Sequence, residues 1–344
     1  MRVALCDYVS SYSKAYQFGG VQVKMFEKAH WLMERGHEVA VYASPLTFGP
    51  RLTTAAAHMR GVPYFEGWRQ TIKADVAYVW YYSPLAWRFL FSMDCPKVAG
   101  LHAPGLLTRS SYRYHLFRTV GSQDMSAFDA VRIVNPVFKF QHRKVYHIPD
   151  WVDIGDFRQQ ENRSAKFTVL FVGRAHGGKG WDDFAEMASI LRGRGHDFDF
   201  VATGEGNGVV RGLGRVDRKD MPEVYSRAHV LAYPAWADTF GIVIIEAMAC
   251  GVPVITTPSL AHTRLELPIE YASSAEGFAD KVVSVYQEWA RDTEAYEARR
   301  PQRRQAVAKF DARSVLPSLE KMFTQVANRE VSAVEAALSH RIAE

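Results

Sequence analysis

The sequence predicts two similar α/β domains, each built around a parallel β-sheet. One observation is a unit of strand, glycine-rich loop, helix and strand at the start of the chain, and a second is a copy of that unit near residue 168. The third is that the helix of each unit runs into an Arg-Gly-His turn, at Arg35–His37 and at Arg194–His196. A glycine just past a helix ends it readily because it adopts the left-handed backbone conformation. A chain of 344 residues is also long enough for two domains.

The first unit begins with the apolar strand Val3–Cys6 and returns as the strand Val39–Tyr42. Between them, apolar residues recur at the spacing of one helix face, and these are Val21, Met25, Ala29 and Leu32. This spacing predicts an amphipathic helix that packs on a sheet. The unit is therefore a βαβ crossover, which joins parallel strands.

The second unit has the strand Thr168–Val172, a glycine-rich loop and the strand Phe198–Ala202. Its helix carries four apolar residues on one face: Trp181, Phe184, Ala188 and Leu191. Further buried strands are predicted at 230–233 and 254–257, and further helices at 277–289 and 315–326. A polar stretch with a proline, residues 148–164, separates the two units, so we predict domains over 1–158 and 159–312, followed by C-terminal helices over 313–344.

Composition excludes several classes of protein. Hydrophobic residues make up 48% of the chain and charged residues 23%, so it is neither disordered nor fibrous. Its three cysteines, Cys6, Cys95 and Cys250, lie far apart and form no C-x-x-C pair, which argues against a disulfide framework or a zinc site and favours a reducing compartment. No stretch predicts a signal peptide or a membrane span. We therefore expect a cytoplasmic protein that is at most peripheral to the inner face of the membrane.

The net charge of +5 is concentrated in the N-terminal half, where residues 1–150 hold 18 Lys and Arg against 10 Asp and Glu. The segments 87–91 and 109–118 mix positive with aromatic residues. That mixture suits an anionic membrane surface or a phosphorylated acceptor, and it also suits a solvated basic face over buried aromatics. Single-stranded nucleic acid is the least favoured partner, and we predict none.

Two acidic residues, Asp238 and Glu246, bracket an apolar run that begins a predicted helix. Unpaired backbone N–H groups at a helix start attract phosphate. Glu246 lies just over one turn into this helix, where its carboxylate could bind the two hydroxyls of a ribose, or else form a buried ion pair with an Arg or Lys. Asp238 either caps the helix or points at a second sugar. The residues at the helix start are Thr239, Phe240, Gly241 and Ile242.

The loop after the strand Thr168–Val172 places two cations around a glycine turn, in Gly173-Arg174 and in Lys179-Gly180. Positive charges beside backbone amides can seat a diphosphate. The loop is not a Walker A motif, because G-x-x-x-x-G-K-[ST] is absent.

His102 ends a short apolar strand of the first domain and so lies at its predicted ligand edge, although a lone histidine there is more often structural. Asp197 and Asp199 have the D-x-D spacing with which some transferases hold a metal. They start a strand at the opposite edge of the sheet, so we interpret them as structural and predict no metal.

Taken in chain order, these motifs resemble the family 4 glycosyltransferases, which have the GT-B fold and mostly act without a metal and with retention of anomeric configuration. The acid-x7-acid element with its G-x-P-V tail is specific, and the match covers nearly the whole chain. The resemblance implies two Rossmann-like domains that face each other across a cleft, with the last helix crossing back onto the first domain. The matching motifs are Gly19-Gly20, Arg35-Gly36-His37-Glu38-Val39, Gly173-Arg174, Lys179-Gly180, Phe240-Gly241, Glu246-Ala247-Met248-Ala249 and Gly251-Val252-Pro253-Val254.

By position, the resemblance implies that Glu246 holds the ribose and Asp238 the donor-sugar hydroxyls. Arg174 and Lys179 would neutralise the diphosphate leaving group, and His102 would line the donor-sugar pocket. The residues implied to contact phosphate, sugar or base are Gly19, Gly20, Gly173, Arg215, Val216, Thr239, Phe240, Gly241 and Ile242.

Two positions depart from the family pattern. The family usually has Glu at the place of Asp238, so the reach to the donor sugar is shorter here. The family also commonly has Pro-Asn-Gly-Val-Asp where this chain has Pro149-Asp150-Trp151-Val152-Asp153, which affects the loop near the domain linker.

The predicted function is a hexosyltransferase of polysaccharide biosynthesis, which needs no cofactor and moves a sugar from a UDP- or GDP-linked donor to a glycan or lipid-linked acceptor. Two alternatives stay open at this point. One is a nucleotide-sugar epimerase of the same architecture, and the other is a protein that binds a nucleotide sugar without catalysis.

Overall fold

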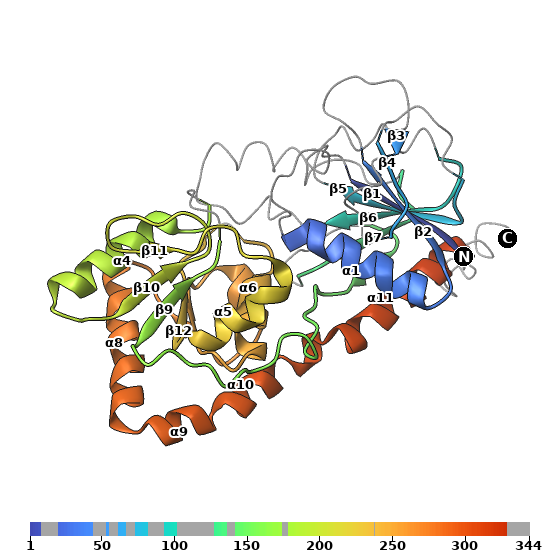
Figure 1. Ribbon diagram of the computed structural model, residues 1–344. Coiled ribbons are helices and arrows are strands. Elements are labelled where there is room, and N and C mark those ends of the chain that lie inside the picture. Colours follow the sequence, from blue (N-terminus) through green and yellow to red (C-terminus); the bar gives the residue numbers. More distant parts are fainter. Residues whose placement is uncertain are drawn as a thin grey trace, which may run out of the picture.

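The computed structural model describes residues 1–7, 20–43, 53–54, 61–66, 73–81, 93–101, 127–135, 142–173, 178–236 and 238–328. These residues form two α/β domains that lie side by side, each with its own sheet (Figure 1). The two-domain prediction is confirmed.

The N-terminal sheet has eight strands in the order β3-β4-β2-β1-β5-β6-β7-β8. All of its pairings are parallel except the one between β3 and β4. Helix α1 (Gly20–Glu34) forms the first crossover, and Met25, Ala29 and Leu32 on its predicted apolar face are buried. The strands are β1 (Arg2–Asp7), β2 (Glu38–Ala43), β3 (Thr53–Thr54), β4 (Tyr64–Glu66), β5 (Val76–Tyr81), β6 (Lys97–Leu101), β7 (Ala130–Ile133) and β8 (Val145–His147).

The C-terminal sheet has six parallel strands in the order β11-β10-β9-β12-β13-β14. Helices α4 and α8 cover one face, and α5 and α6 cover the other (Figure 1). The strands are β9 (Thr168–Phe171), β10 (Asp199–Ala202), β11 (Arg211–Gly212), β12 (Val230–Tyr233), β13 (Val254–Thr256) and β14 (Glu270–Tyr271). The helices are α4 (Trp181–Gly193), η4 (Arg218–Asp220), α5 (Met221–Arg227), α6 (Ile242–Ala249), α7 (Leu260–Thr263) and α8 (Ala275–Arg291).

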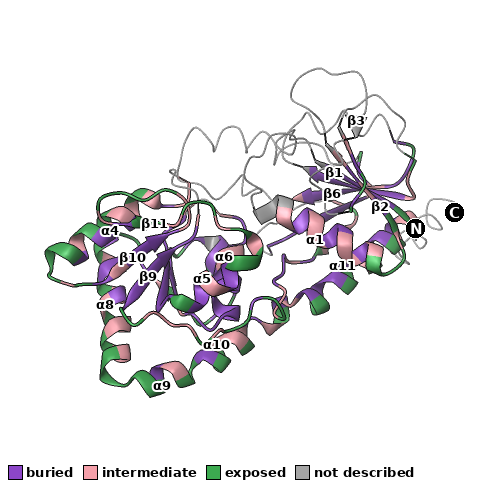
Figure 2. Ribbon diagram, viewed as in Figure 1, coloured by how far each residue is buried: buried purple, intermediate pink, exposed green. Residues whose placement is uncertain are grey.

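Alternating side chains of the central strands pack into two separate hydrophobic cores, one on each face of the sheet. In β9, Val169 and Phe171 pack with α4 and α8, whereas Leu170 packs with α5 and α6. The period of two places successive residues on opposite faces, and both faces are covered, so these strands are apolar throughout. Figure 2 shows the result as buried strands beneath helices whose outer faces are exposed.

The order of the C-terminal strands reverses between β9 and β12, because β10 lies on one side of β9 and β12 on the other. In open parallel sheets, ligands bind in the crevice at such a reversal, beyond the carboxyl ends of the two strands. The loops after β9 and after β12 are those that carry Lys179 and Asp238. The topology therefore places both predicted site segments at one ligand edge.

The chain crosses between the domains twice, and the two crossings lie side by side. Val152 N–H donates to the carbonyl of Phe310 at 2.9 Å, and Ala312 N–H donates to the carbonyl of Val152 at 2.9 Å. Beyond the second crossing, helix α11 (Ala312–Ala327) packs beside α1 in the N-terminal core (Figure 1). The elements that lead to it are α9 (Thr293–Ala298), α10 (Arg300–Ala306) and η5 (Ala308–Phe310).

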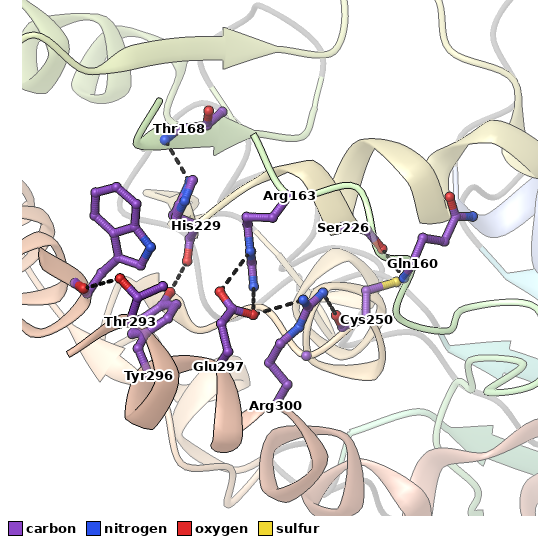
Figure 3. Close-up of polar contacts among 12 residues, drawn as sticks. Gln160, Arg163, Thr168, Ser226, His229, Cys250, Thr293, Tyr296, Glu297 and Arg300 are labelled. Atoms are coloured by element: carbon purple, nitrogen blue, oxygen red, sulfur yellow. Dashed lines mark hydrogen bonds and ion pairs between the residues drawn. The ribbon is translucent and has the colours of Figure 1, made fainter. Parts of the chain in front are cut away.

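The amino ends of β9 and β12 are tied together by a buried polar network (Figure 3). Thr168 N–H donates to Nδ1 of His229 at 3.0 Å, and the Tyr296 hydroxyl donates to the carbonyl of His229. Arg163 pairs with Glu297 through two hydrogen bonds of 3.1 and 3.2 Å. Because Nδ1 of His229 accepts from the backbone, this network needs the ring to be neutral.

We expect acid to destabilise the protein through His229. Burial lowers the pKa of His229 to about 3 from its usual 6.5. Between pH 6.5 and 3 the unfolded chain holds a proton on this ring that the folded chain does not, so stability falls as pH falls, by up to about 1.4 kcal/mol per pH unit. Urea melts at pH 7, 6, 5 and 4 measure this slope.

The matched variant is His229→Asn, whose side-chain oxygen can accept from Thr168 N–H without titrating. Its stability should vary less between pH 6.5 and 4 than that of the wild type. Parallel curves for the two proteins would contradict the assignment to His229.

Candidate functional site

Two glycines set the geometry of the loop after β9. Gly180 has φ +75°, and a Cβ there would lie 2.1 Å from the carbonyl oxygen of Pro234, just past the end of β12. Only a residue without a side chain fits this close approach. Gly173 packs against Cβ of Lys179, 3.4 Å from where its own Cβ would be. The two glycines thus allow the loop that carries Lys179 to pack closely against the carboxyl ends of β9 and β12.

Lys179 meets Asp238 at this edge. Its Nζ lies 3.3 Å from Oδ2 of Asp238 and donates to the Tyr233 hydroxyl at 2.9 Å, while that hydroxyl donates to the same Oδ2 at 2.5 Å. Burial would raise the pKa of Asp238, but Lys179 and the hydrogen bonds outweigh it and lower this pKa to about 2. Lys179, 31% exposed, is a cation that could face a ligand here.

The start of α6 has no side-chain cap, and its N-cap residue is Gly241 in the left-handed conformation, with φ 78° and ψ 53°. Oδ1 of Asp238 instead accepts from the neighbouring Thr239 N–H at 2.8 Å. The capping alternative for Asp238 is therefore wrong, because its carboxylate is turned toward Lys179 and Tyr233. An uncapped helix start beside a lysine can bind an anion.

Glu246 is buried, with 4% of its side chain exposed, and both of its oxygens have partners. Oε1 accepts a short hydrogen bond from Nη1 of Arg218, and Oε2 accepts from the Tyr225 hydroxyl at 2.9 Å. The ion pair left open as an alternative thus exists in this structure. A carboxylate has about four acceptor positions, so these two contacts leave capacity for hydroxyl groups of a ligand.

Arg218 also connects the two domains. It donates to Oε1 of Glu27 on α1 at 2.9 Å, and Glu27 pairs with Lys24 at 2.5 Å. The Arg218 guanidinium stacks over the ring of Phe157 at 4.5 Å. Burial works against the charge, but the Glu246 and Glu27 carboxylates hold the pKa of Arg218 above its usual value.

A second polar contact crosses between the domains beside the start of α6. Asn135, just after β7, is fully buried, and its Nδ2 donates to the carbonyl oxygens of Thr239 at 2.9 Å and Ala261 at 3.0 Å. The N-terminal domain thereby fixes the loops that flank the predicted phosphate seat.

The remaining predicted residues are distributed as follows. The Phe240 side chain is in the core against Phe310, so this residue can offer a ligand only its backbone. Gly173 N–H donates to Oγ1 of Thr203 at 3.1 Å. Arg215 is exposed and Val216 half-buried in the loop that follows β11, and Gly20 begins α1. Gly19, His102 and Arg174 lie outside the described residues, as do the basic aromatic segments 87–91 and 109–118.

The D-x-D pair is occupied by surface ion pairs. Asp197 pairs with Lys166 at 2.6 Å and with Arg192 at 2.9 Å, and Asp199 pairs with Arg211 at 3.1 Å. Within the described ranges, no three His, Cys, Asp or Glu side chains are grouped to hold a metal ion. No helix in that part of the chain is long and apolar enough to cross a membrane.

The sequence reasoning missed three residues that the structure adds to this edge. Tyr233 donates to Asp238, and Arg218 donates to Glu246. No sequence motif marks either residue, because each lies on a different element from its partner. His262 follows the buried strand β13 at the same edge. The rule that selected His102, a histidine after an apolar strand, would also have selected His262.

Comparison with known proteins agrees with this geometry. The family model "Glycosyl transferases group 1" matches residues 166–288, the part that holds Lys179, Asp238 and Glu246. Residues 166–288 are thus similar to the group 1 glycosyl transferases. The matched segment covers the ligand edge of the C-terminal sheet.

Curated relatives include two glycosyltransferases. The O-antigen chain mannosyltransferase B of Escherichia coli is 37% identical over 79 residues, which is 23% of this chain and 18% of that enzyme. The 2-deoxystreptamine N-acetyl-D-glucosaminyltransferase of Niallia circulans is 22% identical over 89% of this chain and 97% of its own length. The more similar stretch is thus short, and the long match is distant.

Solved structures show the same architecture along nearly the whole chain. Sucrose-phosphate synthase from Thermosynechococcus elongatus superposes with a TM-score of 0.71 at 16% identity, over 96% of this chain and 100% of its own. Anabaena HepE in complex with UDP and glucose gives 0.69 at 15% identity, over 94% and 100%. The arrangement of two Rossmann-like domains is the GT-B fold, as the sequence predicts.

Proposed function

We propose that this protein is a glycosyltransferase that moves a hexose from a nucleotide-diphosphate donor to a hydroxyl of a glycan or lipid-linked acceptor. The observation that carries the proposal is the meeting of Lys179 with Asp238, just before the uncapped start of α6, at the strand reversal of the C-terminal sheet. A cation and unpaired N–H groups at one point can bind a diphosphate and stabilise it as it leaves.

The reaction breaks the bond between the anomeric carbon and a diphosphate oxygen and forms one from that carbon to the acceptor oxygen. The charge that develops on the diphosphate is met by Lys179 and the α6 amides. We propose retention of configuration, in which a departing phosphate oxygen takes the acceptor's proton, and no metal ion. Anomeric NMR of the product tests the stereochemistry, and an inverted linkage would overturn it.

We propose that Glu246 binds the ribose of the donor while it stays bound to Arg218 and Tyr225. The donor is proposed to be UDP- or GDP-linked, because related proteins include enzymes named for mannosyl and N-acetylglucosaminyl transfer and a structure solved with UDP and glucose. The acceptor would be held mainly by the basic N-terminal domain. We propose that the activity is cytoplasmic, at an anionic membrane surface, supported by the charge of that domain and by three buried cysteines that form no disulfide.

A thermal-shift panel of UDP, GDP and ADP with their glucose, mannose and N-acetylglucosamine conjugates tests the proposal. A ligand at 100 times its dissociation constant stabilises the folded state by about 2.7 kcal/mol, so the matching nucleotide should raise the melting temperature measurably. The nucleoside without phosphates is the control and should give no shift. No shift with any nucleotide diphosphate would refute the proposal.

Product analysis with the donor alone then separates this function from the two alternatives. An epimerase would convert the donor to another nucleotide sugar without an acceptor. A non-catalytic binding protein would leave the donor intact with and without acceptors.

A further inference from the structure

His262 is a buried histidine at the same ligand edge, and nothing above gives it a role. It lies on α7, its ring centroid is 5.9 Å from that of Tyr233, and it is fully buried. A Cβ built on Gly241 would lie 3.3 Å from Cδ2 of His262. The Cδ2–Nε2 side of the imidazole therefore faces the N-terminal end of α6, where the donor phosphates would bind.

Hydrogen bonds on the other side of the ring fix its tautomer. Nδ1 lies 3.0 Å from Oγ1 of Thr256, 3.3 Å from Oγ1 of Thr257 and 3.2 Å from the Thr257 carbonyl oxygen. The Thr256 hydroxyl already donates its proton to the carbonyl of Tyr233. The Thr257 hydroxyl likewise donates to the carbonyl of Ala235. All three oxygens can therefore only accept from Nδ1, which carries the proton and leaves Nε2 as an acceptor.

Nε2 of His262 is buried and has no hydrogen-bond partner in the part of the chain that the structure describes. Leaving a buried acceptor unpaired destabilises the folded state. Burial lowers the pKa of His262 although the Asp238 charge opposes it, so the ring is neutral at pH 7. The ionised phosphates of a nucleotide sugar carry only acceptors, so Nε2 cannot pair with them. A ligand group that pairs with Nε2 has to be a donor, such as a hydroxyl or an amide N–H.

We propose that Nε2 of His262 accepts a hydrogen bond from a hydroxyl or amide N–H of the donor's sugar and thereby selects which sugar is transferred. The proposal rests on the proposed function, which brings the sugar to this end of α6. Asp238, the residue expected to hold sugar hydroxyls, is already bound by Lys179, Tyr233 and the Thr239 N–H. Nε2 of His262, by contrast, is an acceptor at this edge that has no hydrogen-bond partner among the described residues.

Two substitutions separate the two sides of the ring. The amide nitrogen of His262→Asn replaces Nδ1 and keeps a donor for Thr256 and Thr257, but the side chain has nothing at the place of Nε2. His262→Gln reaches that place with an amide oxygen and gives up the donor at Nδ1. If His262 only anchors its loop, His262→Gln should impair ligand binding more than His262→Asn does. If His262 binds the sugar, His262→Asn should impair ligand binding more.

Isothermal titration with UDP, UDP-glucose, UDP-N-acetylglucosamine, GDP and GDP-mannose measures the difference. For the nucleotide sugar that binds the wild type most tightly, we expect His262→Asn to weaken binding about 3- to 10-fold, the value of one hydrogen bond. Its affinity for the corresponding free diphosphate should be unchanged. His262→Gln should stay within about 3-fold of the wild type for both ligands, whatever its melting temperature.

The inference is overturned if His262→Asn binds the nucleotide sugar as tightly as the wild type. Equal losses for the sugar nucleotide and the free diphosphate also overturn it, because they indicate a structural role. Both of these results leave the proposed function standing. A wild-type protein that binds none of the five ligands overturns the proposed function and the role of His262 together.

Discussion

Lys179→Met is expected to lower kcat about 10²- to 10³-fold while the protein still folds. A preorganised charge aimed at a leaving group typically contributes this much, because it acts in a closed cleft from which water is excluded. The side chain is 31% exposed, and Asp238 keeps its hydrogen bonds from Tyr233 and Thr239, so the fold loses the ion pair with Asp238 and the hydrogen bond to the Tyr233 hydroxyl. Turnover of the donor identified by thermal shift, together with circular dichroism, measures both effects.

The matched control is Lys281→Met, in the same domain. Lys281 pairs with Glu270 at 2.7 Å on the surface, with 44% and 58% of the two side chains exposed, and should affect neither turnover nor folding. Lys179→Arg keeps the charge and should recover part of the activity. Full turnover in Lys179→Met would remove this lysine from the leaving-group site.

Arg218→Met is expected to destabilise the protein by about 3–5 kcal/mol. Removing one partner of a buried ion pair leaves the other charge uncompensated, and Glu246 is 4% exposed. Tyr225 remains as a hydrogen-bond donor to Glu246 but cannot supply a positive charge. The contact with Glu27 of the N-terminal domain is lost at the same time. Urea denaturation at pH 7 gives the free energy of unfolding.

Arg227→Met is the control for this variant, because Arg227 pairs with Glu223 on the surface, where an ion pair contributes about 0–1 kcal/mol. Combining Arg218→Met with Glu246→Gln should restore much of the lost stability, since the buried charge is then gone. If Arg218→Met costs no more than Arg227→Met, the carboxylate of Glu246 is not held in the way described.

Periodicity and glycine placement predicted the fold well. The apolar spacing of Met25, Ala29 and Leu32 matches the buried face of α1, and Gly36 and Gly195 both have φ +82° where each helix was predicted to end. Signals of this kind are local, because they depend on residues within one or two turns of each other. The order of the motifs then sufficed to predict two parallel sheets.

The interactions of the site could be predicted only in part. The sequence predicted that Lys179 and Asp238 lie in loops after two strands. It did not predict that Tyr233 bonds to both of them, or that Arg218 binds Glu246 and Glu27. These contacts depend on which strands become neighbours and on how the two domains meet. Asp238 as a helix cap was a reasonable local alternative that failed because a tertiary partner competed for its carboxylate.

We expect the paired crossings at Val152 and Phe310–Ala312 to act as a hinge between the two domains. Two hydrogen bonds hold the outgoing and returning chain together at one point, so either domain can turn about it without stretching the other connection. Rotation there would change the contacts that Asn135 and Glu27 make with the C-terminal domain. A rotation that separates the domains would break these polar contacts and also withdraw Val134 from the C-terminal core.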